Sequence, residues 1–335
     1  MQKSDKSLPD THWLARLRRL LHYGDRPWQG LLIVISVFVI VLMLAIGGLL
    51  LIQSAAARSA FGLSFLTPTA NPNWDPVNDN FQAWPFLYGT LVTSLFAILF
   101  ALPIGIGIAI FLAEICPNWL RTPLAWMVEL LAAIPSVIYG LWGIFVFLPQ
   151  VVAPVGIFLG DTLGHVPVLG SLFAGPIPAS GSSRLAASLI LTIMIIPTIA
   201  AVSRDVFLAI PNSQREAAKA LGATEWETIW QVLIPYGRSG ILGAVILGLG
   251  RALGETMAVT MVIGNSIQGG ISLLQAGYSM ASIIANEFAE AVSPLHTSAM
   301  IEIGLVLFIM TLLLNIIARF LVWRVARQTP QEMRS

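Results

Sequence analysis

Six long apolar stretches restrict what this chain can fold into. Each has about the 20 residues that one helix needs to cross a bilayer. Hydrophobic residues make up 56% of the 335 residues and charged residues only 10%, whereas a soluble domain is about one-quarter charged. Because lipid offers no partner for backbone amides, the fold class is predicted to be an all-α polytopic membrane protein. The stretches are 31–52, 85–113, 123–149, 185–203, 239–264 and 299–323.

Prolines lie inside three of these stretches, at Pro103, Pro135 and Pro197. A proline removes one helical hydrogen bond, so a neighbouring helix or side chain must satisfy the carbonyl that it frees. The sequence therefore predicts a packed bundle of six transmembrane helices and not a set of separate anchors.

The 18 Lys and Arg residues are divided unequally between the two sides of this bundle. All but three lie in the N-terminal tail, at the C-terminal end (from Arg319 onward) and in the connections after the second and fourth stretches. Arg58 and Arg184 lie in connections on the opposite side, and Arg251 lies within the fifth stretch. Because cytoplasmic connections are enriched in Lys and Arg, both termini are predicted to be cytoplasmic.

The predicted organisation has three parts. These are a cytoplasmic tail (1–30), a six-span body (31–323) with a cytoplasmic loop at 204–238, and a second cytoplasmic tail (324–335). The first stretch is too long for a secretory signal and lacks a small-residue cleavage site, so it is expected to remain as an anchor.

The loop after the fourth stretch is built to form two short helices. S-x-x-E at 213–216 and T-x-x-E at 224–227 match capping boxes, in which the first and last side chains satisfy each other's backbone amides. Gly222 lies where a left-handed residue would end the first helix, and Pro235 is expected to stop the second. A helix–glycine–helix element in an aqueous loop is therefore predicted.

Arg251 and Glu255 are the main intramembrane charges. They are four residues apart, so they are expected to share one face of a helix. One interpretation is a structural ion pair, and the favoured one is a site for an oxyanion, because the arginine fork suits phosphate above all. Gly250 and Gly254 would allow another helix to approach closely there. A single Arg cannot neutralise a divalent anion, so a second cation from another subunit is expected.

Other polar residues are weaker candidates. Glu129 and Glu302 are expected near the membrane surfaces, Tyr139 either lines a pathway or packs, and Trp226 with Trp230 is expected to anchor the loop on its surroundings. Cys116 is the only cysteine, and the four histidines are far apart in the sequence, so no metal site is expected.

Nucleotide chemistry is not expected in this chain. A P-loop needs G-x-x-x-x-G-K-[ST], but Lys3, Lys6 and Lys219 have no such glycines before them. An ATP-driven process would therefore need a separate ATPase. A membrane-bound enzyme and a channel or ion-coupled carrier are the alternatives. The first lacks catalytic motifs, and the second has no need of a doubly capped cytoplasmic helix pair.

Three motifs together resemble a known family. Glu216, Ala217, Ala218, Gly222 and Pro235 match the EAA loop of ABC importer permeases. With IPSVIYGLWG at 134–143 and GRALGETMAV at 250–259, the chain resembles the PstC-type permeases of bacterial phosphate-specific ABC importers. The resemblance implies a type I importer architecture, with Arg251 and Glu255 as the translocation residues and the EAA residues as the ATPase coupling loop.

The resemblance also implies partners. These are a homologous permease subunit (PstA-like), an ATPase dimer (PstB-like) that binds ATP and Mg²⁺, an external phosphate-binding protein (PstS-like) and membrane lipid. No cofactor is expected in this chain and no nucleic acid among its partners. A related oxyanion such as molybdate or sulfate remains the alternative substrate, because an arginine recognises charge and not protonation.

Overall fold

The computed structural model describes residues 25–68, 74–167, 170–267 and 270–327, which are almost entirely helical. Most of the two predicted tails lies outside the described residues. The chain divides into two units, one up to Ile52 and one from Gln53 onward, and each is described by itself.

The first unit consists of helix α2 (Asp25–Gln53), which covers the predicted stretch 31–52. Its apolar window carries side chains such as Ile33, Phe38 and Leu44, with no charge between Leu31 and Gln53. A helix that is apolar on every side fits lipid or a neighbouring transmembrane helix as its surroundings.

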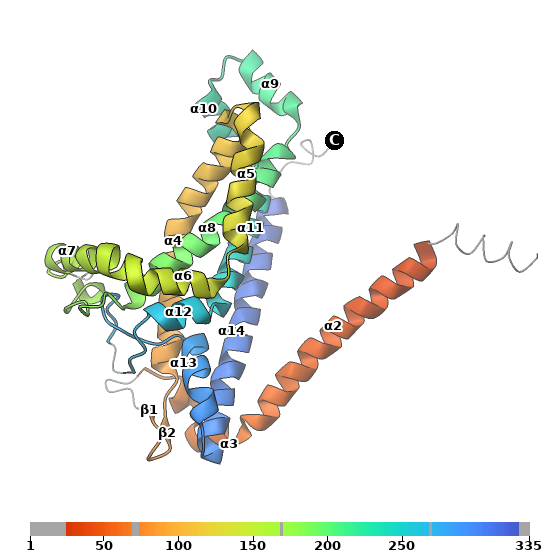
Figure 1. Cartoon of the computed structure of the whole chain (residues 1–335). Coiled ribbons are helices and arrows are strands. Elements are labelled where there is room, and N and C mark those ends of the chain that lie inside the picture. The colour runs from red at the N-terminus through yellow and green to blue at the C-terminus, as the bar shows by residue number, and fades with distance from the viewer. Residues whose placement is uncertain (1–24, 69–73, 168–169, 268–269, 328–335) are drawn as a thin grey trace, which may run out of the picture. The chain divides into compact units, whose positions relative to one another are not determined.

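The second unit is a helical bundle (Figure 1). Its long elements are α4 (Trp84–Ile110), α5 (Asn118–Ala133), α8 (Arg184–Leu208), α11 (Ile234–Gly254) and α14 (Pro294–Arg327). Shorter helices are α3 (Ala55–Phe61), α6 (Ser136–Trp142), α7 (Ala153–Leu163), α9 (Asn212–Ala220), α10 (Glu225–Thr228), α12 (Met257–Val262) and α13 (Met280–Glu287). Strands β1 (Trp74–Asp75) and β2 (Asn80–Phe81) pair antiparallel.

Helix α8 is the centre of the bundle and packs against α4, α5 and α11. Its side chains Ile190, Met194 and Ile195 are fully buried, and Ala97 and Ala101 of α4 lie against them. Because lipid tails are as apolar as leucine, helices associate in membranes through close packing of small residues. The alanines of α4 provide this contact.

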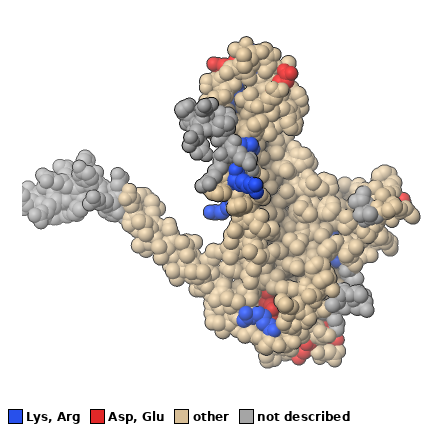
Figure 2. Space-filling model, turned by 180° about the vertical axis from the view of Figure 1, so that it is seen from behind, with Lys and Arg blue, Asp and Glu red and all other residues tan. Residues whose placement is uncertain are grey.

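Six helical segments of the described residues are long and apolar enough to cross a membrane. Figure 2 shows a broad uncharged belt between charged side chains at the two ends of the bundle. The predicted all-α class with six spans is therefore confirmed. Several predicted boundaries are wrong, however, because the helices of the third and fifth stretches are interrupted.

The third stretch breaks in its middle. Helix α5 ends at Ala133, Ile134 is extended with ψ 128°, and α6 begins after Pro135. A proline disfavours the helical conformation of the residue before it, which explains the extended Ile134. The helix then continues through a π-helical segment, Gly143–Val152, into α7, so the apolar span runs from Ser136 to Leu163 and not over 123–149.

The fifth stretch also breaks, close to its intramembrane charges. Helix α11 ends at Gly254, Glu255 is extended with ψ 122°, and α12 follows. The hydroxyl of Thr256 donates to the Gly254 carbonyl at 3.3 Å, so a side chain satisfies a carbonyl that the helix has left free. The predicted continuous helix over 239–264 is therefore wrong.

Candidate translocation and coupling sites

Arg251 lies in the last turn of α11, at the place where three elements meet. Its guanidinium donates to the Thr198 hydroxyl of α8 and to the Ala132 carbonyl at the end of α5, both at 3.3 Å. Thr198 follows Pro197, and Ala132 precedes the break at Ile134. The side chain is therefore held between the continuous helix α8 and the last turn of α5, where helical carbonyls lack their ordinary partners.

Glu255 does not pair with Arg251. The described residues contain no ion pair between the two, and Glu255 Oε1 instead accepts from the Ala258 amide of α12 at 3.3 Å. The expectation that they share one helical face is wrong, because α11 ends between them. Glu255 acts as a cap for α12, since its carboxylate satisfies one of the free amides at that helix start.

The surroundings of Arg251 combine a packed side with an open side. Tyr139 of α6 is 7% exposed and donates from its hydroxyl to the Leu131 carbonyl at 2.9 Å, which closes the α5–α6 bend. Gly250 and Gly254, by contrast, have no atom within 4 Å of where a Cβ would lie. The described residues of the second unit leave this glycine face open, and the expected close approach of another helix there stays a prediction.

The geometry around Arg251 suits exchange of an anion. A guanidinium has five N–H donors in a planar fork, and only two hydrogen bonds to described residues hold this one. Both are neutral acceptors at the long end of the hydrogen-bond range. A tetrahedral oxyanion would form shorter, charge-assisted bonds, so the arginine can give up its present partners for it.

The other two carboxylates differ: Glu129 is paired with Arg204, whereas Glu302 Oε2 has no hydrogen-bond partner among the described residues. Glu129 lies 3.1 Å from Arg204 and its side chain is 51% exposed, and its expected place near the membrane surface stays a prediction. Glu302 lies in α14 and is 5% exposed. No contact between described residues joins Glu129 or Glu302 to Arg251. The translocation candidates therefore remain Arg251 and Glu255.

The loop 204–238 forms the predicted helix–glycine–helix element. Helix α9 ends at Ala220, Gly222 has φ +90°, and Thr224 begins α10. The Thr224–Glu227 capping box is confirmed: each side chain accepts from the other residue's backbone amide. The Ala223 amide donates to the Ala218 carbonyl, which closes the end of α9 around the glycine.

Two expectations for this loop are wrong. The capping box at Ser213 and Glu216 does not form, because α9 begins at Asn212 directly after Pro211 and Ser213 is already inside the helix. Pro235 does not stop the second helix. A π-helical segment, Ile229–Leu233, joins α10 to α11, and Pro235 occupies the first turn of α11, where its missing amide is best tolerated.

Arg215 attaches this element to the bundle, a role the sequence analysis did not identify. Its side chain bonds to Glu114 at 2.8 Å and to the Phe207 and Ile210 carbonyls at 2.7 and 2.6 Å. The Arg215 and Glu114 side chains are only 14% and 13% exposed. Glu114 is 101 residues away in the π-helical end of α4, so no local pattern indicates the pair.

A hollow of about 540 Å³ lies between α9 and the start of the fifth span. Ala217, Ala218 and Gly222 line it, and Leu221 at its edge is 91% exposed. On the same element, Trp226 and Trp230 are 62% and 53% exposed. This amount of exposed apolar surface at a charged end of the bundle is typical of a contact surface for another protein.

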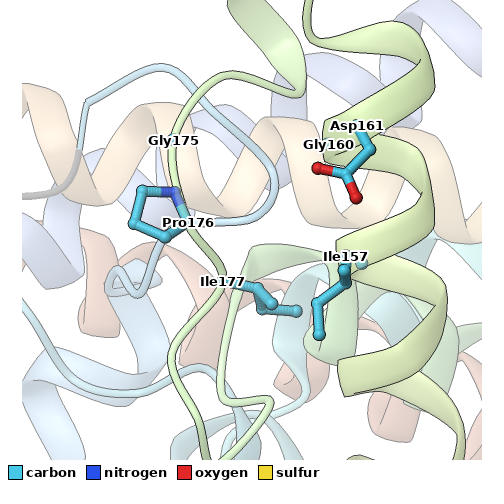
Figure 3. Close-up of a pocket in the computed structure, with 7 residues that line it drawn as sticks. Ile157, Gly160, Asp161, Gly175, Pro176 and Ile177 are labelled. Carbon is cyan, nitrogen blue, oxygen red and sulfur yellow. The ribbon is translucent and has the colours of Figure 1, made fainter.

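A second hollow, of about 370 Å³, lies at α7. Figure 3 shows Gly160 and Asp161 on the helix and Gly175 and Pro176 on the facing segment. Its lining includes Asp161 but no Lys or Arg among the described residues. A carboxylate without a cation repels anions, so this hollow does not suit an oxyanion.

Residues 105–327 match the family of binding-protein-dependent transport system inner membrane components. The phosphate transport system permease protein PstC of Xylella fastidiosa strain Temecula1 is 44% identical over 305 residues, 91% of this chain and 92% of the relative. PstC of Haemophilus influenzae strain Rd is 47% identical over 287 residues, 86% and 89% of the two chains. This chain belongs to the PstC permease family.

Solved structures agree with that membership. The crystal structure of a bacterial alginate ABC transporter in complex with alginate pentasaccharide-bound periplasmic protein matches with a TM-score of 0.58 at 16% identity, over 92% of this chain and 98% of that chain. An inward-facing MetNI methionine ABC transporter matches with a TM-score of 0.51 at 20% identity, over 71% and 93%. The PstC-family chain therefore has the type I ABC importer permease fold and is a multi-pass inner-membrane protein.

Proposed function

We propose that this chain is the permease subunit of an ATP-driven phosphate importer. Relatives that are 39–47% identical and named phosphate transport system permease proteins support the substrate. The observation that carries the proposal is Arg251, a permanent cation held by two long bonds to neutral acceptors, one in α8 and one at the end of α5. Arg251 is the phosphate contact, and Glu255 positions α12 beside it.

Phosphate binding follows from the donors at this site. The arginine fork leaves the Ala132 carbonyl and donates to two oxygens of the anion. The Thr198 hydroxyl, which now accepts from Arg251, can turn and donate to a third oxygen. The second positive charge comes from a PstA-like permease that packs on the open face of Gly250 and Gly254, so the pathway lies between the two subunits.

Energy comes from a separate PstB-like ATPase dimer, which binds ATP and Mg²⁺. The α9–α10 element is its docking surface, because Ala217, Ala218 and Gly222 line an open hollow beside the exposed Leu221. Both termini and this element are cytoplasmic. A PstS-like protein delivers phosphate at the opposite end of the bundle.

Uptake into proteoliposomes tests the proposal. The complete complex is reconstituted, and ATP-dependent uptake of labelled phosphate is measured with sulfate or molybdate as competitor. We expect phosphate uptake that equimolar sulfate does not reduce. Wild-type uptake of sulfate or molybdate in preference to phosphate would assign the site to another oxyanion, and ATP-independent uptake would exclude an ATP-driven importer.

A further inference from the structure

A polar hollow of about 450 Å³ lies at the end of the bundle opposite α9 and α10. Strand β1, helix α13 and the start of α14 form it, and its lining includes Trp74, Tyr278, Asn286, Glu287, Glu290 and His296. Two carboxylates and two aromatic rings thus surround one open space. No Lys or Arg is among the described residues that line it.

Glu287 is held by one hydrogen bond, and its charged partner among the described residues is His296 at 3.9 Å, an ion pair only when the imidazole is protonated. Its Oε2 accepts from the Trp74 indole at 2.6 Å, and burial raises the pKa of its carboxyl above the ordinary value. Burial disfavours a carboxylate because water no longer solvates it. A cation that enters the hollow would stabilise the ionised form, and the exposed Glu290 adds a second negative charge at the rim.

His296 provides an independent sign that a ligand is missing. It is 5% exposed, its ring stacks on Phe81 at 4.9 Å, and its Nε2 has no hydrogen-bond partner. This nitrogen lies 3.9 Å from Glu287 Oε2, beyond hydrogen-bond distance. Buried polar atoms are nearly always paired. With its proton on Nδ1, the imidazole presents Nε2 as an acceptor for an incoming N–H.

Exposed apolar side chains next in sequence to the lining residues indicate what kind of molecule carries the N–H group that His296 accepts. Val77, Phe288 and Val292 are neighbours in sequence of the lining residues and are 89%, 48% and 94% exposed. Exposed apolar side chains around desolvated polar groups are the arrangement of a protein interface. Figure 2 shows acidic side chains and a basic patch together at this end of the bundle. The lining of the hollow itself carries Glu287 and Glu290 and no described Lys or Arg, so the side chain that fits it is basic.

We infer that this hollow receives a lysine or arginine side chain of the binding protein and so fixes its docking position on the permease. The inference rests on the proposed function, in which the binding protein docks at the end opposite α9 and α10. Glu287, Glu290 and His296 accept from the cation, and Trp74 and Tyr278 contact its aliphatic stem.

Binding measurements on the complete complex in nanodiscs test the inference, with the purified phosphate-binding protein as the probe. Glu290→Gln is expected to weaken binding roughly threefold to tenfold, and Glu290→Lys more than tenfold, mostly through slower association. The salt dependence of binding should become shallower in both variants. Basal ATPase activity, measured without the binding protein, should not change, because Glu290 is exposed.

Asp161→Asn is the matched control, since it removes an exposed carboxylate from the hollow at α7. It should leave binding unchanged. Binding by Glu290→Lys within twofold of the wild type would overturn the inference, and so would equal weakening by Asp161→Asn and Glu290→Gln, which would indicate a general surface field.

Phosphate uptake at saturating binding protein separates the two proposals. No uptake by the wild-type complex would refute the proposed function, whereas equal uptake by wild type and variants at every binding-protein concentration would refute only the docking site.

Discussion

Removal of the Glu114 charge is expected to loosen the α9–α10 element from the bundle. Arg215 is bonded to Glu114 through both Nη2 and Nε, at 2.8 and 3.2 Å, and both side chains are more than four-fifths buried. Breaking a buried pair and leaving one charge uncompensated costs about 3–5 kcal/mol. Here Arg215 retains the Phe207 and Ile210 carbonyls, so we expect Glu114→Gln to cost about 1.5–3 kcal/mol, the range of one hydrogen bond to a charged group.

The lost free energy had held α9 in place on the bundle. In the proposed importer this element docks the ATPase, so the loss is expected to weaken docking. A loss of about 2 kcal/mol lowers an affinity by about thirtyfold if all of it opposes the docked position. Co-purification of the ATPase and the ratio of phosphate transported to ATP hydrolysed measure the effect. Both should fall while the six-span body stays inserted.

The pair of Lys219 and Glu225 provides the control on the same element. It is as short, at 2.6 Å, but its side chains are 47% and 75% exposed. Surface pairs of this kind contribute little, so Glu225→Gln should leave coupling unchanged. Normal ATPase association in Glu114→Gln, or equal loss in both variants, would refute the reasoning from burial.

Further predictions concern the translocation residue, the turn, the topology and pH. Arg251→Gln should abolish phosphate uptake while ATPase association persists, and Arg251→Lys should be impaired because an ammonium lacks the fork. The double variant with Glu255→Gln should stay inactive, since the two residues are not paired; recovered uptake would contradict the substrate contact. Gly222→Val should strain the backbone at φ +90° by about 1–3 kcal/mol. It should reduce ATPase co-purification without loss of insertion, and normal ATPase association in this variant would contradict a role of the turn in coupling. A reporter fused after Gly222 should be cytoplasmic and one after Asn78 external, and the reverse result would end the six-span topology. The pKa of the Glu287 carboxyl is higher in the folded state than in the unfolded chain. Its contribution to the free energy of unfolding is therefore present below the unfolded pKa and is lost as pH rises through the folded pKa. The thermal stability of Glu287→Gln should lack this decline with pH, and a decline equal to that of the wild type would contradict the prediction.

Local features of this chain were predictable because their causes lie within a few residues. The Thr224–Glu227 box and Gly222 depend on contacts between near neighbours, and both are present. The six spans follow from composition alone. The Ser213 box failed although its motif is complete, because the helix start after Pro211 lies two residues earlier than a cap at Ser213 requires.

Features that depend on distant residues could not be predicted in this way. Spacing suggested that Arg251 and Glu255 share a face, but the spacing rule holds only while the helix continues, and Gly254 ends it. Glu114 and Arg215 are 101 residues apart and meet only after α4 and α8 pack. The sequence offered only a Glu directly after the second predicted stretch and an Arg within the loop after the fourth, with no local pattern that links them.

The 3.3 Å bonds of Arg251 have a kinetic consequence for the proposed importer. A site that holds its cargo too firmly becomes a trap, because each turnover must end in release. Neutral acceptors that Arg251 can regain after the anion leaves lower the free energy of the empty site and so speed departure. The acceptor Ala132 lies beside the bend at Ile134, and Arg251 itself lies beside the bend at Glu255. A pivot at either bend therefore changes how well Arg251 is held when the site is empty, and we expect release in the proposed importer to be coupled to such a movement.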